Sequence, residues 1–228
     1  MDLVNRKNPF KILVTVNCVI FGFDGKQLKV LMIRSRNETK KRQWHLIGDF
    51  LGKDEDADSA ATRVLNDLIG KDAYIEQLNT ASTVKNGARR RTISITYVAL
   101  INIEDYEEDG GGEYEARWFT VSEVPEVNVD CKTILLAAIE RLRFKVAHDP
   151  LGFALLPEKF TLPQLRSFFE AIYEVPLDRR NFIKKMHSMG VLQKLNEKDK
   201  QSSRKGAFYY VFDDQKYREV QSSRLRFV

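Results

Sequence analysis

Short apolar runs rich in β-branched residues alternate with polar turns through the first part of the chain, which is the pattern of β-strands. The first two runs flank the turn residues 23–26 and therefore predict a β-hairpin. The run at 91–103 is the longest and the most β-branched. All the strand-like runs together lie at 12–21, 28–33, 43–47, 81–84, 91–103 and 115–120.

Two helices are expected among these strands. Asp56 or Asp58 can act as the N-cap of a helix that runs to about Leu68, and Gly70 follows as a left-handed stop. A second helical segment runs from about 130 to 147 and closes this unit. Strands mixed with helices in this way predict an α+β domain.

A cluster of turn-forming residues from His148 to Gly152 separates this unit from a second helical pattern. We place the domain boundary there. The first domain then covers residues 1–147 and the second covers residues 148–228. Each is long enough to bury its own core.

The second unit has the element order of a winged helix-turn-helix. Thr161 is a candidate N-cap with Pro163 in the first helical turn. Another helix covers 179–189 and stops at Gly190. Two short strands at 191–195 and 207–212 follow, joined by the polar, basic segment 196–206. This layout indicates a DNA-binding domain with a wing.

Charge is unevenly distributed along the chain. Residues 1–146 contain 22 basic and 22 acidic side chains, whereas residues 147–228 contain 15 basic and 10 acidic ones. The whole excess of five positive charges therefore lies in the last third, as expected for a domain that binds a polyanion such as DNA. A solvated lysine-rich surface would give the same count, so charge alone leaves both interpretations open.

Composition excludes several classes of protein. The two cysteines, Cys18 and Cys131, have neither metal-ligand spacing nor a nearby partner, so neither a zinc site nor a disulfide framework is expected. The N-terminal residues lack an apolar signal region, and no stretch reaches the length of a membrane-spanning helix. We therefore expect a cytoplasmic protein without a membrane partner.

The stretch from Trp44 to Gly70 resembles the Nudix box, G-x5-E-x7-R-E-U-x-E-E-x-G, where U is a bulky aliphatic residue. The upstream Trp44-x-Leu46-x-Gly48 also fits the run that commonly precedes the box. Asp49 stands where the first glycine belongs. The other matched positions are Glu55, Arg63, Leu65 and Gly70.

Two of the three acids in the core of this box are missing. The positions concerned are 64, 67 and 68, which lie on one face of a helix because they are spaced i, i+3 and i+4. In Nudix hydrolases that face gathers carboxylates around Mg²⁺. Here it reads Val64, Asp67 and Leu68. The resemblance therefore implies a Nudix fold without diphosphate hydrolysis, with no metal, no cofactor and no catalytic residues.

The predicted second helix of the C-terminal domain carries a run of DNA-contacting residue types. Its apolar residues can face the core, which leaves the polar ones outward. Arginine reads guanine, asparagine reads adenine, and lysine contacts phosphates. At the wing, Ser202 to Lys205 suit backbone or minor-groove contact. The candidates for DNA binding are Arg179, Arg180, Asn181, Lys184, Lys185, Ser203, Arg204 and Lys205.

A degenerate Nudix domain joined to this tail resembles the Nudix-related transcriptional regulators of the NrtR and AraR type. The likeness includes Leu155 to Leu162 at the junction and Leu177 to Phe182 in the recognition helix. It implies a Nudix-type α/β/α sandwich followed by a winged helix-turn-helix. It also implies a homodimeric repressor of an inverted-repeat, double-stranded DNA operator, whose effector binds the Nudix domain and weakens the operator complex.

The effector is harder to predict than the fold. Loss of the metal acids, and of the glycine at position 49, favours a neutral sugar such as L-arabinose over ADP-ribose, which would make the protein closest in character to AraR and a regulator of sugar catabolism. For Asn17 and His45 a purely structural role stays open. The candidate residues, all polar and on apolar strands or near the box, are Asn17, Arg34, His45, Asp49 and Tyr97.

Three other interpretations remain open. One is a Nudix hydrolase with displaced metal ligands, drawn from Glu55, Asp67 and either Glu113 or Glu115. Another is an ADP-ribose-responsive regulator of NAD metabolism. The third is an interaction scaffold whose basic tail binds RNA or an acidic protein, although no RNP-like aromatic motif supports it.

Overall fold

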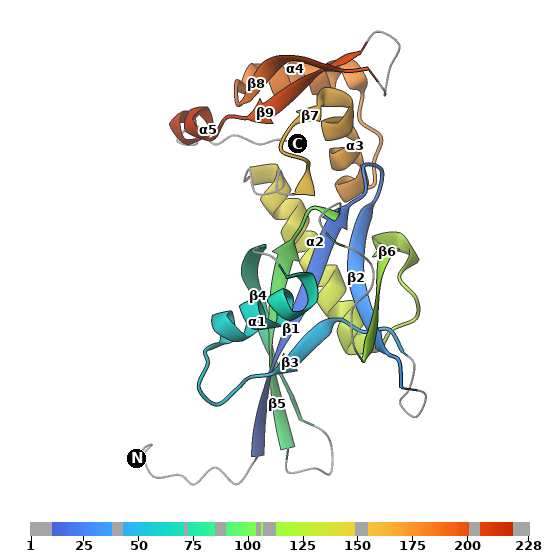
Figure 1. The fold of residues 1–228 in the computed structure, drawn as a ribbon, viewed down its shortest axis with the longest axis vertical. Helices are drawn as coiled ribbons and strands as arrows, with labels where there is room; N and C mark the ends of the chain where they lie inside the picture. The colour runs from blue at the N-terminus through green and yellow to red at the C-terminus, as the bar shows by residue number, and fades with distance from the viewer. Residues whose placement is uncertain are drawn as a thin grey trace.

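The computed structural model describes residues 11–37, 43–70, 73–84, 90–103, 106, 113–148, 155–200 and 206–220. Figure 1 shows a long mixed sheet with helices on both of its faces, and a smaller domain at one end. The predicted architecture, a Nudix-type sandwich followed by a winged helix domain, is confirmed. No described helix combines the length and the apolar character that a membrane span requires.

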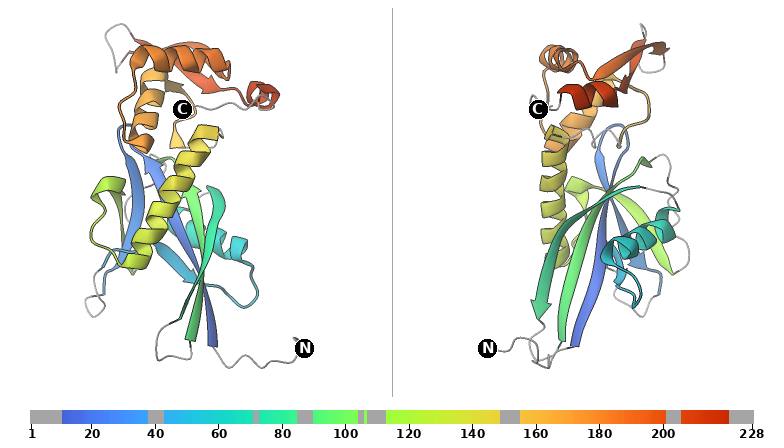
Figure 2. Two further views of the ribbon diagram at one scale, coloured as in Figure 1. Left: turned by 180° about the vertical axis from the view of Figure 1, so that it is seen from behind. Right: turned by 90° about the vertical axis from the view of Figure 1, so that its left-hand side faces the viewer.

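The large sheet has the strand order β4-β5-β1-β2-β6, and β3 pairs with β1 beside this path. β1 and β5 run parallel, and the other pairs are antiparallel. Helices α1 and α2 cover opposite faces (Figure 2). The elements are β1 (Lys11–Phe23), β2 (Leu28–Ser35), β3 (Ile47–Phe50), α1 (Ala57–Ile69), β4 (Tyr74–Val84), β5 (Arg90–Leu100), β6 (Tyr114–Thr120), the short 3₁₀ helix η2 (Val121–Glu123) and α2 (Val129–His148).

Alternation along the strands divides the core into two layers. Val16, Cys18 and Ile20 of β1 are buried in the layer that packs against α1. Val19 and Phe21 point the other way, into the layer beneath α2. Because successive side chains of a strand face opposite sides of the sheet, each strand supplies both layers. The same rule decides which strand residues can reach the cleft beside α1.

The ends of α1 follow from the expected capping residues. The side chain of Asp56 accepts a hydrogen bond from the Ser59 amide at 2.7 Å, so Asp56 rather than Asp58 is the N-cap. Gly70 closes the helix in the left-handed conformation, with φ of 68°. Glycine adopts this conformation without steric cost.

The C-terminal domain is a helix-turn-helix with a three-stranded sheet in the order β7-β9-β8. A capping box begins α3, because Thr161 and Gln164 satisfy each other's backbone amides. Asp178 caps α4, and Gly190 ends it with φ of 68°. The elements are β7 (Phe160–Thr161), α3 (Leu162–Tyr173), α4 (Arg179–Met189), β8 (Leu192–Asp199), β9 (Ala207–Phe212) and α5 (Asp214–Val220).

Several boundaries differ from the sequence-based expectation. β4 begins at Tyr74, well before the expected 81, because its first half mixes apolar with polar residues instead of forming an apolar run. β3 covers 47–50 and not 43–47, since its pairing with β1 fixes its position. The short β7 and α5 were not anticipated. Of the expected linker, only His148 is described, and it is the last residue of α2.

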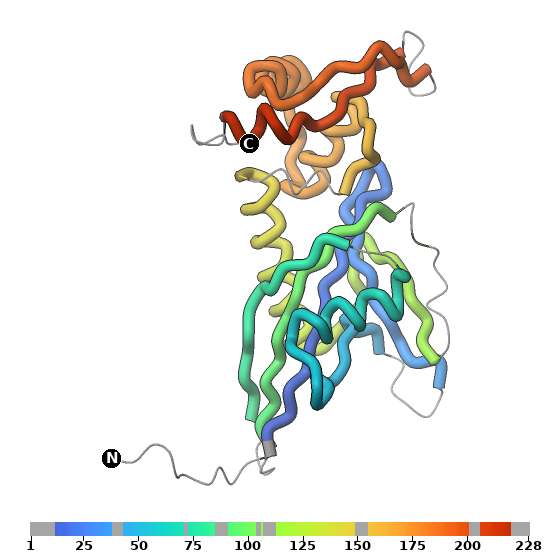
Figure 3. The backbone as a smooth tube through the Cα atoms, turned by 60° about the vertical axis from the view of Figure 1, so that its left-hand side comes forward, coloured from blue at the N-terminus to red at the C-terminus, as the bar shows by residue number. Residues whose placement is uncertain are grey.

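The two domains share one continuous core. Buried residues beneath α2 and inside the winged helix domain form a single cluster. At the junction, Phe23 near the tip of the β1–β2 hairpin meets Phe168 of α3 edge-to-face, with ring centroids 5.4 Å apart. The tube in Figure 3 shows this hairpin reaching up to α3 while α2 runs alongside. The winged helix domain is therefore packed directly on the Nudix domain.

Candidate functional site: the cleft at α1 and the face of α4

A cleft of about 320 Å³ opens where β3 and the box loop meet α1. It shares Asp49 and Arg63 with a wider adjoining hollow of about 480 Å³ that follows the loop from 49 to 55. Small-molecule sites typically occupy 300–1,000 Å³. The cleft is lined by Ile33, His45, Ile47, Gly48, Asp49, Arg63, Val64, Asp67, Leu68 and Tyr114.

Arg63 is the only arginine or lysine among the residues lining the cleft and the hollow, and two acids hold it in place. Its guanidinium donates to the Glu55 carboxylate at 2.8 and 3.1 Å and to Asp49 at 2.9 Å. Hydrogen bonds from Arg63 and from the Gly52 amide hold the pKa of the Glu55 carboxyl below its ordinary range. This triad fixes the box loop against α1.

The face of α1 that would bind a metal ion is largely apolar. Val64 is only 4% exposed, and it packs with the half-buried Leu68 into the core layer beneath α1. Asp67 is the one carboxylate among the three positions. No group of three or more His, Cys, Asp or Glu side chains in the described ranges could hold a metal ion. These residues do not fit the magnesium centre of a Nudix hydrolase.

The displaced-ligand alternative finds little support in the geometry. Glu55 is already bonded to Arg63. Glu115 lies on the other face of the sheet, where both of its carboxylate oxygens accept from Arg34 at 2.6 and 2.9 Å. Neither Glu113 nor Glu115 forms a metal-binding group with Glu55 and Asp67 in the part of the chain that the structure describes.

Of the five candidate effector residues, the structure brings only His45 and Asp49 together in the cleft. Ile33 lines the cleft, so alternation along β2 sends Arg34 to the opposite face, where its guanidinium lies 4.6 Å from the ring centroid of Trp44. Asn17 likewise lies on the face of β1 that is turned away from α1.

Asn17 and Tyr97 have structural contacts instead. A Cβ atom on Gly48 would come within 2.6 Å of the Asn17 Oδ1 atom, which explains the glycine before the box. Tyr97 is buried under α1, and its hydroxyl donates to Asp58 in the first helical turn. Burial and this carboxylate raise the pKa of Tyr97. Both residues thus hold the walls of the site together.

Tyr114 is a cleft residue that the sequence analysis missed. It is 40% exposed, and its ring lies edge-on to His45 with centroids 6.5 Å apart. The pairing of β6 with β2 brings it there from a distant part of the chain. Arg63 was recognised in the box but was not named as a site residue, although its charge beside an open hollow was a usable signal.

The outer face of α4 is basic. Arg179, Arg180, Asn181 and Lys184 are exposed and Lys185 is half-buried, whereas Phe182, Met186 and Met189 are buried. The Asp178 side chain accepts from the Asn181 amide at 2.9 Å and fixes the start of the helix. In Figures 1 and 3, α4 lies at the end of the molecule away from the large sheet. A duplex could approach it there without meeting the Nudix domain.

The wing offers two lysines that the sequence analysis did not single out. The ammonium groups of Lys194 and Lys198 on β8 lie 3.6 and 4.4 Å from the centroid of the Phe208 ring. Cation–π contact of this kind holds flexible lysines in place. The three wing candidates, Ser203, Arg204 and Lys205, lie outside the described residues.

Comparison with known proteins agrees with this description. Residues 11–137 match the Nudix domain family, and residues 152–212 match the NrtR DNA-binding winged helix domain. A curated relative, the ADPR responsive transcriptional repressor NtrR of Acinetobacter baylyi, is 29% identical over 210 residues, which cover 90% of this chain and 84% of the relative.

Two solved structures are similar to this chain. Shewanella oneidensis NrtR complexed with a 27mer DNA has a TM-score of 0.76 at 25% identity, covering 94% of this chain and 97% of that one. The Nudix domain of the same NrtR complexed with ADP ribose has a TM-score of 0.50 at 27% identity, covering 61% of this chain and 94% of that one. With its Nudix match over more than half its length and its NrtR-type winged helix, the chain belongs to the Nudix family, as one of its DNA-binding transcriptional regulators.

Proposed function

We propose that this protein is a transcriptional repressor whose affinity for its operator falls when ADP-ribose binds in the cleft beside α1. Support comes from the relatives: one repressor of this domain arrangement is ADPR responsive, and the Nudix domain of another was solved with ADP ribose. The NrtR-type winged helix and its basic α4 provide the DNA-binding part.

The charge of the cleft is the observation that carries this proposal. A hydrolase face with three carboxylates needs Mg²⁺ before it can accept a diphosphate, because like charges repel. Here Val64 and Leu68 remove two of those charges, while Asp67 remains and Arg63 offsets part of the charge of Asp49 and Glu55. The cleft is therefore less negative than a hydrolase site, which favours binding of a diphosphate without a metal ion and without cleavage.

The expectation of L-arabinose rested on the same two substitutions and on Asp49 at the first glycine position of the box, and the relatives do not support it. The inference from missing acids to a neutral ligand fails for a physical reason. Carboxylates that a hydrolase needs for chemistry are not needed for binding, and their loss makes the cleft less negative. ADP-ribose, the alternative effector, therefore fits better.

Each part of ADP-ribose has a suitable partner among the cleft residues. Tyr114 presents an exposed aromatic ring, on which an adenine can stack. Arg63 supplies a positive charge for the diphosphate, which would have to bind beside its pairs with Glu55 and Asp49 or displace one of them. His45 and Asp49 line the same cleft and carry groups that can bond ribose hydroxyls. The adjoining hollow along the loop 49–55 gives the room that a dinucleotide-sized ligand needs.

The operator side of the proposal rests on the position of α4. Its N-terminal residues Arg179, Arg180 and Asn181 are placed to read bases, and the lysines one turn later to contact phosphates. We propose that a homodimer presents two such helices to an inverted repeat whose half-sites are about one helical turn, or a multiple of it, apart.

A ligand screen by thermal denaturation tests the effector. ADP-ribose at 100 times its Kd should stabilise the protein by about 2.7 kcal/mol, because it binds only the folded state. L-Arabinose and free ribose should have no effect. Tyr114→Ala should weaken binding, while Tyr209→Ala, which alters a half-buried tyrosine of the wing, should not. Stabilisation by L-arabinose and not by ADP-ribose would reverse the assignment.

The same samples test the hydrolase alternative. With Mg²⁺ or Mn²⁺, the protein should release no AMP from ADP-ribose above the background rate. Asp67→Ala should leave that background unchanged. Metal-dependent turnover that disappears in Asp67→Ala would show that the domain is an enzyme.

A further inference from the structure

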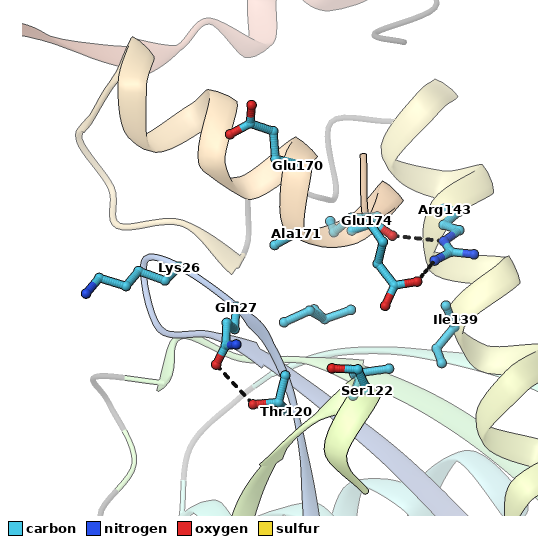
Figure 4. A pocket seen from close by; sticks show the side chains of 12 residues that line it. Lys26, Gln27, Thr120, Ser122, Ile139, Arg143, Glu170, Ala171 and Glu174 are labelled. Atoms are coloured by element: carbon cyan, nitrogen blue, oxygen red, sulfur yellow. Dashed lines mark hydrogen bonds and ion pairs between the residues drawn. The ribbon is translucent and has the colours of Figure 1, made fainter. Parts of the chain in front are cut away.

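The junction of the two domains holds a polar contact that reaches the turn of the helix-turn-helix. A small cavity of about 140 Å³ lies there, bounded by the hairpin tip, by the end of β6 with η2, and by α2 and α3 (Figure 4). Arg143 projects from α2 towards the last turn of α3.

Arg143 makes two bonds to the end of α3. Its Nε donates to the Ile172 carbonyl oxygen at 2.8 Å, and a terminal nitrogen donates to the Glu174 carboxylate at 2.9 Å. In return, the Tyr173 hydroxyl donates to the Arg143 carbonyl oxygen at 2.8 Å. The last carbonyls of a helix lack partners within the helix and carry the negative end of its dipole. The guanidinium of Arg143 donates a hydrogen bond to one of these carbonyls and places a positive charge at the negative end of the dipole.

The residue that Arg143 contacts has an unusual backbone. Glu174 is the only non-glycine residue with positive φ in the described chain, at 55°. This left-handed conformation ends α3 and turns the chain towards α4. It costs a residue with a side chain on the order of 1 kcal/mol, so neighbouring contacts must hold it. Arg143 supplies one such contact from the Nudix domain, and Glu170, which accepts from the Leu177 amide at 2.9 Å, supplies another from α3.

The strands that border this junction also border the effector cleft. β2 contributes Ile33 to the cleft and Leu28 to the junction cavity. Its partner β6 contributes Tyr114 to the cleft and Thr120 to the cavity. At the cavity end, Thr120, Gln27 and Lys29 are joined by hydrogen bonds of 2.9 to 3.0 Å. The same strand pair therefore connects the effector cleft with the surface against which α3 packs.

We propose that Arg143 is a positioning residue for the recognition helix: by holding the left-handed turn at Glu174 it keeps α4 in the orientation that binds the operator, and the effector acts by loosening this contact. The inference rests on the proposed function for the effector, but it makes a separate statement about the free protein. Without Arg143, the effector-free protein should resemble the effector-bound wild type.

The test compares Arg143→Met with Arg141→Met, a matched control on the same helix. Arg141 also pairs with a glutamate, but with Glu76 inside the Nudix domain. Operator affinity is measured for the full chain by fluorescence anisotropy, with and without saturating ADP-ribose, and ADP-ribose affinity by calorimetry. Amide hydrogen exchange of residues 174–182 in the effector-free protein reports the turn directly.

In wild type and Arg141→Met, ADP-ribose should weaken operator binding by about 10-fold or more, within the usual range of allosteric coupling. In Arg143→Met the effector-free affinity should fall to nearly the effector-bound value, leaving a ratio below about 3-fold. Amides of the turn should exchange faster, and ADP-ribose should bind more tightly than to wild type, because it no longer has to loosen the contact. Glu174→Gln should lower the effector-free operator affinity in the same way as Arg143→Met. The double variant Arg143→Met/Glu174→Gln should lower it little further, because both changes remove the same contact.

Two results would overturn the proposal. If Arg143→Met weakens operator binding equally with and without ADP-ribose, the arginine only stabilises the fold. If exchange at the turn and effector-free affinity both match those of Arg141→Met, the contact does not position α4. Should ADP-ribose leave the wild type unaffected, the assigned effector is wrong, yet exchange and effector-free affinity still decide the role of Arg143.

Discussion

Helices α1 and α4 are built by the same local rules but present opposite chemistry. Each starts at an aspartate N-cap, Asp56 or Asp178, and each ends at a left-handed glycine with φ of 68°. In α1 the face at the metal-binding positions of the Nudix box is largely apolar, and Val64 of this face is part of the core. In α4 the corresponding outward face is basic and exposed.

The contrast teaches that capping and periodicity set where a helix lies, whereas its outward residues set what it does. A Nudix helix can lose its metal-binding acids without losing its place in the fold, because Ala60, Ala61, Val64 and Leu65 still pack against the sheet. In this chain Val64 and Leu68 line the cleft at the positions where a Nudix hydrolase carries carboxylates.

The largest effect is expected when an acid is placed on the apolar face of α1. Val64→Glu should lower the free energy of unfolding by about 3–5 kcal/mol, because the new carboxylate would be buried without a partner. The exposed control Asn66→Glu should change it by less than about 0.5 kcal/mol. Urea denaturation measures both. If Mn²⁺ restored the stability of Val64→Glu, α1 would still have a metal-binding face.

Substitutions on α4 test the second half of the comparison, the DNA-binding role of its basic face. Arg180→Ala should cost about 1–3 kcal/mol of operator binding and relax the preference at one base pair, as for a lost base contact. Lys185→Ala should weaken specific and scrambled duplexes alike and reduce the salt slope by about one. Titrations at several salt concentrations separate the two. Equal losses on both duplexes, with identical slopes, would remove base readout from this helix.

The ion pairs between Glu76 of β4 and the basic residues of α2 should make the stability of the fold depend on pH. Burial alone would raise the pKa of the Glu76 carboxyl, but hydrogen bonds from Lys145, Tyr74 and Arg141 outweigh it and lower the pKa to about 2. Because the folded pKa lies below the unfolded one, this stabilisation is complete above about pH 4.5 and is lost as the pH falls towards 2.

Glu76→Gln should therefore destabilise the protein at neutral pH by roughly 1–2 kcal/mol, after allowing for solvent screening of its partly exposed partners. The difference from wild type should shrink as the pH approaches 2. Thermal denaturation between pH 7 and 2.5 measures it. A difference that stayed constant over this range would exclude the carboxylate as the cause.

The smallest expected effect concerns the two N-caps. Asp56→Ala and Asp178→Ala should each cost about 1 kcal/mol of stability, since each removes one hydrogen bond to an orphan amide. Only Asp178→Ala should also weaken operator binding, because it loosens the start of α4. If Asp56→Ala reduced operator affinity as much as Asp178→Ala does, the start of α1 would affect DNA binding by α4, which is not expected.

Much of the fold could be predicted from local sequence patterns. The ends of α1 and α4 follow from aspartate caps and glycine stops, and the hairpin at 23–26 follows from its turn residues. The missing acids at 64 and 68 follow from the spacing of the box alone. Each of these features depends on residues that are close together in the sequence, so the local sequence is sufficient to predict it.

The composition of the cleft was decided only by the tertiary structure. Whether a polar strand residue such as Arg34 faces the cleft or the opposite side depends on strand register, which is fixed by pairing between distant segments. The same pairing brings Tyr114 to His45, and the packing of α2 on α3 brings Arg143 to Glu174. Such contacts depend on where whole elements pack against one another, and no local pattern in the sequence encodes that.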